Sequence, residues 1–181
     1  MSNITLGIIG GGQLGSMLAI AAKKLNIKTV VLCDDINAPA QNFCNKFIFG
    51  NYDNKKKIVE FINMVNIVTF EFENIPYETL NDINKLKQVL PKPSINRLIQ
   101  HRLAEKDFIN KLNIRTTRYV SIEKKSDIEA LEDFLPGILK TTTLGYDGKG
   151  QYAIKSIEEL NSLNVDFSKG FILEKLVKLK K

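Results

Sequence analysis

Strand-like and helix-like patterns alternate along the first half of the chain. The predicted strands are short apolar runs at residues 4–9, 29–33, 47–49 and 67–72. Between them, apolar positions three or four residues apart predict helices at residues 14–25 and 58–65. Alternating strands and helices favour a parallel sheet with right-handed crossovers, so we expect an α/β domain here.

The pattern changes around Pro91 and Pro93, where we place a domain boundary. Proline continues neither a sheet ladder nor a helix interior. We expect Ser94 to cap a helix that runs through Ile99, and a second helix to follow at residues 102–112. The later predicted strands follow Thr116 directly and then cover residues 137–140, 151–154 and 171–174, with helices at 126–134 and 157–163. This mixture predicts an α+β domain.

A glycine cluster follows the first predicted strand and opens the first predicted helix. It satisfies the pattern G-x-G-x-x-G and consists of Gly10, Gly11, Gly12, Gln13, Leu14 and Gly15. A helix N-terminus offers unpaired N–H groups and a positive dipole end, so the cluster predicts a phosphate site. The alternative is a tight turn in which glycine only relieves a clash. Asp34 and Asp35 lie about 20 residues further on, so a nicotinamide dinucleotide is also a candidate ligand.

A loop rich in hydroxyl groups and glycine follows the predicted strand at 137–140. It runs from Thr141 to Gln151 and carries Lys149, while Lys140 ends the strand before it. Backbone N–H groups in such a loop can hold phosphate oxygens, and the two lysines supply mobile charges. The loop lacks the pattern of a P-loop. An ordinary hairpin turns in about two residues, so we favour a lid over nucleotide phosphates.

A third cluster, Glu71-Phe72-Glu73-Asn74, ends the predicted strand at 67–72. Alternation along a strand places Glu71 and Glu73 on the same side. Ligands of open parallel sheets bind beyond the carboxyl ends of the strands, which is where we expect Glu73. The alternative is a solvated edge. His101 is the only histidine, so the sequence offers neither a multi-histidine metal site nor a second histidine partner, and we interpret it as incidental.

The composition limits the class of protein. The 181 residues are 44% hydrophobic and 25% charged, which excludes an intrinsically disordered chain. No long uncharged apolar stretch is present, so we expect no membrane span. The net charge of +6 comes without a recognition helix or zinc spacing, so we expect an anionic small molecule and no nucleic acid as the partner. Cys33 and Cys44 are not spaced as C-x-x-C and indicate reduced thiols of a cytoplasmic protein.

Several blocks of the sequence together resemble the ATP-grasp superfamily, and within it the family of 5-(carboxyamino)imidazole ribonucleotide synthases. In chain order these are GIIGGGQLGSML at 7–18, APA at 38–40, TFEFENIP at 69–76, HRLAEK at 101–106, LKTTTLGYDGKGQ at 139–151 and ILEKLV at 172–177. The resemblance implies a Rossmann-like pre-ATP-grasp domain with a parallel sheet at residues 1–96. A linker helix and the small α+β ATP-grasp lobe are then expected at residues 97–181.

The same resemblance implies roles for individual residues. Arg102 and Lys140 are expected to contact the phosphates of ATP. The lid over them is expected to comprise Gly145, Tyr146, Asp147, Gly148, Lys149, Gly150 and Gln151. The segment that lines the adenine pocket is expected to comprise Glu174, Lys175, Leu176 and Val177. The residues expected to hold the substrate, with loop amides on its 5′-phosphate, are Gly11, Gly12, Gln13, Leu14 and Glu73.

The implied reaction is the carboxylation of aminoimidazole ribonucleotide in purine biosynthesis. ATP phosphorylates bicarbonate, with Mg²⁺ bridging phosphate oxygens, and the carboxyl group then passes to the exocyclic amine of the substrate. A closing lid excludes water from the labile mixed anhydride. The full-length protein is expected to form a homodimer.

This chain departs from the family pattern in two residues and in length. Ser16 stands where arginine usually follows GGGQLG, and His101 stands where an acidic residue often precedes the arginine. Family members are considerably longer. We therefore expect the large ATP-grasp lobe, with the catalytic and metal-binding residues, to be missing, and little or no turnover.

Three alternatives remain open. The related ATP-dependent formyltransferase acting on glycinamide ribonucleotide shares the architecture, but GGGQLG and EFENIP fit it less well. A non-catalytic nucleotide-binding fragment is favoured by the short length. A nicotinamide oxidoreductase fits least, because it gives the lid loop no role.

Overall fold

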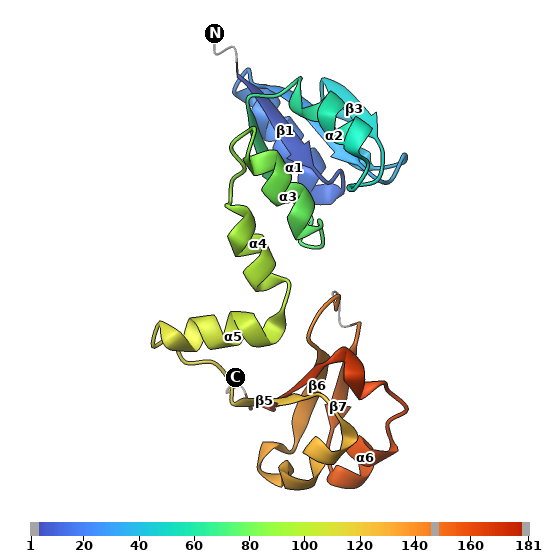
Figure 1. Cartoon of the computed structure of the whole chain (residues 1–181), viewed down its shortest axis with the longest axis vertical. Coiled ribbons are helices and arrows are strands. Elements are labelled where there is room, and N and C mark those ends of the chain that lie inside the picture. The colour runs from blue at the N-terminus through green and yellow to red at the C-terminus, as the bar shows by residue number, and fades with distance from the viewer. Residues whose placement is uncertain (1–3, 146–148, 179–181) are drawn as a thin grey trace. The chain divides into compact units, whose positions relative to one another are not determined.

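The computed structural model describes residues 4–145 and 149–178, with the exception of the side chains of residues 129 and 130. The chain forms two compact units, Met1–Arg97 and Leu98–Lys181. The first contains a parallel sheet and the second a separate antiparallel sheet (Figure 1). The predicted fold class, an α/β domain followed by an α+β lobe, is confirmed.

The first unit is built on a four-stranded parallel sheet in the order β3-β2-β1-β4. Its strands are β1 (Thr5–Ile9), β2 (Lys28–Cys33), β3 (Lys46–Phe49) and β4 (Ile67–Phe70). Its helices are α1 (Gln13–Lys24), α2 (Lys55–Ile62) and α3 (Tyr77–Asn84), with a 3₁₀ turn η1 at Pro39–Asn42. Helix α3 was not among the elements predicted from the sequence.

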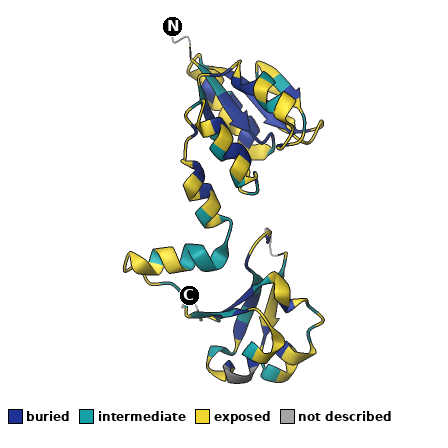
Figure 2. Cartoon of the chain, in the orientation of Figure 1, coloured by how far each residue is buried: buried dark blue, intermediate teal, exposed yellow. Residues whose placement is uncertain are grey.

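Side-chain alternation gives this sheet two buried faces. Ile8 and Val31 point to one face, where they pack with Ala19 of α1. Ile9 and its neighbours point to the other face and pack against Phe61 of α2. These side chains are almost completely buried, as the dark strands in Figure 2 show. Burial on both faces explains why the central strands β1 and β2 are mainly apolar, as is typical of parallel sheets.

The second unit is built on an antiparallel sheet in the order β5-β8-β6-β7. Its strands are β5 (Tyr119–Ile122), β6 (Gly137–Thr141), β7 (Gln151–Ile154) and β8 (Phe171–Lys175). Its helices are α5 (Arg102–Lys111) and α6 (Ile157–Ser162), with 3₁₀ turns η2 (Lys125–Ala130), η3 (Glu132–Phe134) and η4 (Phe167–Lys169). The short helix α4 (Pro93–Ile99) runs across the boundary between the units.

The antiparallel sheet separates an apolar core from a polar face. Leu139 pairs with Leu173 across β6 and β8, and both belong to the core of this unit. In the same ladder Lys140 pairs with Ile172, and Ile138 pairs with Glu174. Because successive residues alternate in direction, Lys140 and Glu174 lie on the face opposite the core.

Three predictions, of a strand end, a helix cap and a helix type, are wrong. Strand β4 ends at Phe70 rather than residue 72, because its neighbour β1 ends at Ile9. The last hydrogen bond between the two strands is donated by Glu71 N–H to Ile9 O, at 3.0 Å. Helix α4 begins at Pro93, whose fixed φ suits a first helical position, so Ser94 lies inside the helix and is not its cap. The predicted helix at 126–134 consists of two 3₁₀ turns, because Ile128 and Leu131 are both buried at a spacing of three residues.

Candidate functional site

The glycine loop of the first unit joins β1 to α1. Gly10 has a φ of +97°, a left-handed conformation that favours glycine. Its N–H donates to Leu32 O at 2.9 Å, which ties the loop to β2. Gly11 O accepts a 3.0 Å hydrogen bond from Ala40 N–H, so the loop is also fixed to η1. The predicted strand–turn–helix arrangement is therefore present, with a rigid loop.

A carboxylate lies against this loop. Gly12 N–H donates to Glu71 Oε1 at 2.9 Å, although the two residues are 59 positions apart. Gln13 and Leu14 begin α1 and are exposed, while Glu73 is exposed in the turn after β4. Glu71, one of the two glutamates that were expected to share one side, contacts the glycine loop through this hydrogen bond.

An apolar hollow of about 550 Å³ adjoins the loop, between α1 and the end of β4. It is lined by Leu14, Met17, Leu18, Ala21, Phe70 and Glu71. The side chains of Leu14 and Met17 are 57% and 56% exposed. Leu14, a predicted substrate contact, thus borders a hollow whose polar end is the Glu71 carboxylate.

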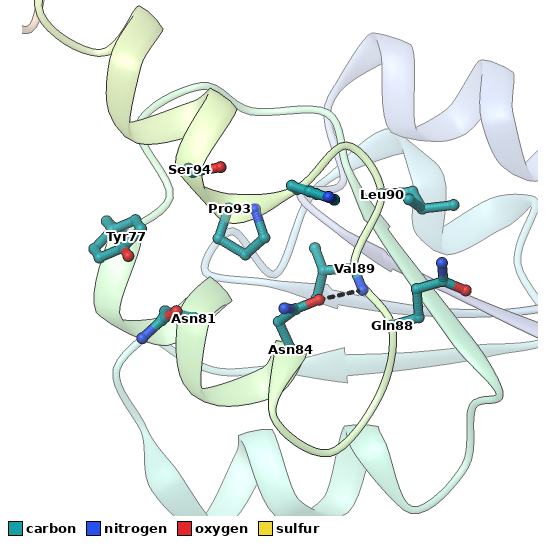
Figure 3. A pocket seen from close by; sticks show the side chains of 9 residues that line it. Tyr77, Asn81, Asn84, Gln88, Val89, Leu90, Pro93 and Ser94 are labelled. Carbon is teal, nitrogen blue, oxygen red and sulfur yellow. Dashed lines mark hydrogen bonds between the residues drawn. The ribbon is translucent and has the colours of Figure 1, made fainter.

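A second hollow of the first unit, of about 290 Å³, lies where α3 ends and α4 begins (Figure 3). Its lining is mostly amide and hydroxyl side chains, among them Asn81, Asn84, Gln88 and Ser94. Asn84 Oδ1 accepts a 3.0 Å hydrogen bond from Val89 N–H, the dashed line in Figure 3. None of the predicted site residues lines this hollow.

The polar face of the antiparallel sheet carries a buried cluster of charges. Lys140 Nζ lies 2.9 Å from Glu174 Oε2, and Lys106 Nζ lies 3.4 Å from Glu174 Oε1. The side chains of Glu174, Lys106 and Lys140 are only 10%, 15% and 22% exposed. Two lysines against one carboxylate leave an excess positive charge, which suits an anionic ligand.

The start of α5 is attached to the first part of the lid loop. Arg102 N–H donates to Thr142 O at 2.8 Å, and the Arg102 guanidinium donates to Thr141 O at 2.7 Å and also to Gly145 O. The helix is capped by His101, whose Nδ1 accepts from Ala104 N–H at 3.4 Å. The interpretation of His101 as incidental is therefore wrong, because this side chain is the N-cap of the helix that carries Arg102 and Lys106.

The predicted lid loop is described only at its two ends. Thr141 N–H donates to Gly150 O at 3.0 Å, and Lys140 pairs with Gln151 in the β6–β7 ladder, so the base of the loop is closed. Lys149 is exposed. The predicted lid residues Tyr146, Asp147 and Gly148 lie outside the described residues.

The segment predicted to line the adenine pocket follows β8. Lys175 N–H donates to Arg118 O and Leu176 N–H to Pro136 O, both at 2.9 Å. The Lys175 ammonium donates to Asp133 O at 2.7 Å, which directs this side chain to η3. The side chains of Leu176 and Val177 are exposed. The apolar side chains of this segment are therefore accessible, whereas two of its backbone N–H groups already have partners.

A tyrosine lies beside the charge cluster. The Lys106 ammonium lies 5.3 Å from the centre of the Tyr119 ring, within the range of a cation–π contact. Tyr119 Oη donates to Asp107 Oδ1 at 2.6 Å, and this hydrogen bond raises the pKa of the tyrosine. Tyr119 thus stays protonated while its ring faces Lys106.

Each of the two units matches a known domain family. Residues 3–100 match the ribonucleotide synthetase preATP-grasp domain, and residues 107–181 match the ATP-grasp domain. The chain therefore belongs to the family of the ribonucleotide synthetase preATP-grasp domain. Among the described residues, no helix has the length and apolar character that a membrane span requires.

Several relatives are named N5-carboxyaminoimidazole ribonucleotide synthase. The N5-carboxyaminoimidazole ribonucleotide synthase of Aquifex aeolicus is 38% identical over 179 residues, which are 97% of this chain and 47% of that protein. The bifunctional purine synthesis protein purC/E of Dictyostelium discoideum is 41% identical over 149 residues, 81% of this chain and 15% of that protein. A crystal structure described as the ADP complex of purK, an N5-carboxyaminoimidazole ribonucleotide synthetase, matches with a TM-score of 0.90 at 35% identity. That match covers 98% of this chain and 48% of the crystal chain, so this chain spans about half the length of that relative.

Sequence reasoning missed two residues of the candidate sites. Lys106 was part of the HRLAEK block but received no role, although it lies one helical turn after Arg102 and on the same side of α5. Glu71 was passed over in favour of Glu73, and its contact with Gly12 carries no local signal in the sequence. The signal that could have identified Lys106 is its spacing of four residues from Arg102, which places both side chains on one side of a helix.

Proposed function

We propose that this chain forms the ribonucleotide-binding domain (residues 1–96) and the small ATP-binding lobe (residues 97–181) of an N5-carboxyaminoimidazole ribonucleotide synthase. The proposed reaction is the ATP- and bicarbonate-dependent carboxylation of aminoimidazole ribonucleotide. The observation that carries the proposal is the buried cluster in which Lys140 and Lys106 share Glu174 at the base of a glycine-rich loop. The shared name of the relatives supports the carboxylase over the formyltransferase that acts on glycinamide ribonucleotide.

In this proposal the second unit binds ATP. Arg102 and Lys140 hold the phosphates, and Lys106 adds a third positive charge on the same face. The loop from Gly145 to Gln151 covers the phosphates and keeps water away from the reacting groups. Glu174 and the segment Lys175, Leu176 and Val177 border the adenine, with the exposed Leu176 and Val177 side chains offering it an apolar surface.

The first unit is proposed to bind aminoimidazole ribonucleotide through Gly11, Gly12, Gln13, Leu14 and Glu73. The apolar hollow beside Leu14 and Phe70 supports this placement, because a flat heterocyclic ring can pack against apolar side chains. Bicarbonate and a homodimeric assembly belong to the same proposal.

The described residues do not by themselves form a magnesium site. Among residues 4–145 and 149–178, no group of three or more histidine, cysteine, aspartate or glutamate side chains is placed to hold a metal ion. Glu174 is already paired with two lysines. The side chains of this part of the chain therefore do not fit Mg²⁺ on their own, although ATP carries phosphate oxygens that this ion prefers.

Calorimetric titration of the chain with ATP tests the nucleotide site. Lys140→Ala should weaken binding by roughly 10- to 100-fold, because a hydrogen bond from a charged group contributes about 1.5–3 kcal/mol. The matched control is Lys155→Ala, which removes an exposed lysine of the same unit. Equal affinities for the wild type and Lys140→Ala would contradict the proposed site, as would a wild type that fails to bind ATP.

An activity assay separates turnover from binding alone. Phosphate release from ATP is measured with aminoimidazole ribonucleotide and bicarbonate, first with this chain and then with the C-terminal half of the Aquifex aeolicus relative added. Release that needs both small substrates supports the carboxylase. ATP binding without release in either mixture favours the second candidate, a nucleotide-binding module without catalysis.

A further inference from the structure

Helix α5 begins with a histidine as its N-cap. The Nδ1 atom of His101 accepts a hydrogen bond from Ala104 N–H at 3.4 Å. The first N–H groups of a helix have no partner within the helix, and a cap supplies one of the missing acceptors. The preferred capping side chains, those of serine, threonine, aspartate and asparagine, accept through an oxygen atom. A histidine cap differs from them because its acceptor is a ring nitrogen that takes up a proton near neutral pH.

The protonation state of His101 decides whether this cap bond exists. A neutral imidazole has one nitrogen that accepts and one that donates, whereas both nitrogens of an imidazolium ion donate. After protonation, the Nδ1–H group would face Ala104 N–H, and two donors form no hydrogen bond with each other. The charge of the imidazolium ion would also lie at the positive end of the helix dipole. Both effects oppose the cap once the ring is charged.

The charged groups around His101 come from three parts of the second unit. A hollow of about 350 Å³ borders the histidine, and Glu123 after β5 and Lys169 of η4 line this hollow too. On α5 itself, Arg102 follows directly, and Glu105 lies one turn further on, where its N–H donates to His101 O at 3.0 Å. The two charges in the hollow are opposite in sign and partly offset each other. His101 is half-buried beside the hollow, so protons from solvent can reach it.

The cap lies next to the residue that attaches α5 to the lid loop. Arg102 N–H donates to Thr142 O at 2.8 Å. The Arg102 guanidinium donates to Thr141 O at 2.7 Å and also to Gly145 O. These hydrogen bonds come from the first residue of α5, so they depend on an ordered first turn. Loss of the His101 cap weakens that turn and thereby the attachment of the helix to the loop.

We propose that His101 is a positioning residue that holds Arg102 and the lid loop together while its ring is neutral and loosens this attachment on protonation. Histidine side chains change charge between about pH 5 and 8, so the start of α5 loses stability as the pH falls through this range. Under the proposed function, on which this last step rests, Arg102 contacts the phosphates of ATP. The affinity for ATP therefore falls over the same range of pH.

A pH titration of the isotope-labelled full chain, followed by NMR, tests the cap without any nucleotide. His101 is the only histidine, so the imidazole signals belong to one residue. The Ala104 amide signal should shift with the same midpoint as the imidazole signals. The matched variant is His101→Asn, which keeps an acceptor at the cap but does not titrate, so its Ala104 signal should stay in place. Between about pH 8 and pH 5.5, the unfolding constant of the second unit should rise roughly fivefold relative to this variant. An Ala104 signal that does not follow the imidazole titration overturns the inference.

Calorimetric titration with ATP at the same two pH values tests the positioning role. Phosphate groups themselves titrate near pH 6, so the dissociation constant of the wild type is divided by that of His101→Asn at each pH, which cancels this effect. The ratio should rise roughly threefold or more at the lower pH, because a smaller fraction of the wild type is competent to bind. A ratio that stays constant or falls overturns the positioning role. If neither protein binds ATP at the higher pH, the proposed function fails, whereas the Ala104 titration still decides whether the cap depends on pH. His101→Asp supplies a second cap that keeps its charge in this range if His101→Asn does not fold.

Discussion

At the scale of single residues, Glu174 joins two lysines that come from different elements. Lys140 reaches it along β6 and Lys106 reaches it from α5, each lysine using a different oxygen of the carboxylate. A buried carboxylate is costly unless it is paired. The lysines therefore stabilise the lobe before any nucleotide arrives, and they provide the charge that a nucleotide requires.

Lys106→Met tests this double role. The substitution keeps an unbranched apolar side chain but removes the charge, so the free energy of unfolding should fall by about 1–2 kcal/mol. ATP binding should weaken too, though less than in Lys140→Ala, because the Lys106–Glu174 contact is the longer one. Urea denaturation and calorimetry measure the two effects.

The matched control for this variant is Lys111→Met, at an exposed lysine on the same helix. If both variants lower the free energy of unfolding and the ATP affinity by the same amount, these losses come from the removal of a surface charge of the helix rather than from the charge cluster. Combining Lys106→Met with Glu174→Gln should then give less than the sum of the single effects, because the second change removes the carboxylate that the first leaves underpaired.

At the scale of elements, α5 positions Arg102 and Lys106 together, and its first turn depends on His101. The cap bond from Ala104 N–H to His101 Nδ1 is long, at 3.4 Å. An aspartate is a better cap than histidine, and its charge interacts favourably with the helix dipole.

His101→Asp should therefore stabilise the second unit by about 0.5–1 kcal/mol, whereas His101→Ala should destabilise it by about 1 kcal/mol. Thermal unfolding of both variants, followed by circular dichroism, provides the measurement. A lower melting temperature for His101→Asp than for His101→Ala would refute the assignment of His101 as the functional cap.

The elements themselves were largely predictable from the sequence. Strand β7 has the predicted bounds, and β2 differs from its prediction by one residue, because apolar runs bounded by turn residues are local signals. The predicted helix at 126–134 failed because a spacing of three buried residues also fits 3₁₀ turns. The end of β4 depended on where its neighbour β1 leaves the sheet, which no local pattern of β4 contains.

The candidate sites were less predictable, because their contacts join distant parts of the chain. The glycine loop and the lid loop were identified from their local residue patterns and from the predicted strands that precede them. However, the acceptor of Gly12 N–H lies 59 residues away, on Glu71, whereas the sequence analysis had favoured Glu73 as the site residue. The pairing of Lys106 with Glu174 joins α5 to β8 and depends on how the helix lies against the sheet.

At the scale of the whole molecule, each unit has a core of its own. Phe61 is fully buried in the core on one face of the parallel sheet, and Leu160 is fully buried in the core of the antiparallel sheet. Each apolar cluster draws its members from one unit. The two units are therefore expected to respond separately to core substitutions.

Phe61→Ala should destabilise the first unit by about 3–5 kcal/mol through lost burial and a cavity. Leu160→Ala should act in the same way on the second unit, by about 2–5 kcal/mol. Amide hydrogen exchange should show the loss of protection confined to residues 4–97 in the first variant and to residues 98–178 in the second. Loss of protection throughout the chain in either variant would show that the units fold as one.

Because Glu174 contacts both lysines, its carboxylate vibrations should change when a nucleotide binds to the lobe. Its Oε1 atom faces the Lys106 ammonium, and its Oε2 atom faces the Lys140 ammonium. A polyphosphate that draws one lysine away leaves the carboxylate unevenly solvated, and the carbon–oxygen stretches of the two bonds become unequal. In infrared spectra of the chain labelled with ¹³C in the glutamate side chains, these stretching bands should therefore shift when nucleotide binds. No dye and no label on the ligand are needed.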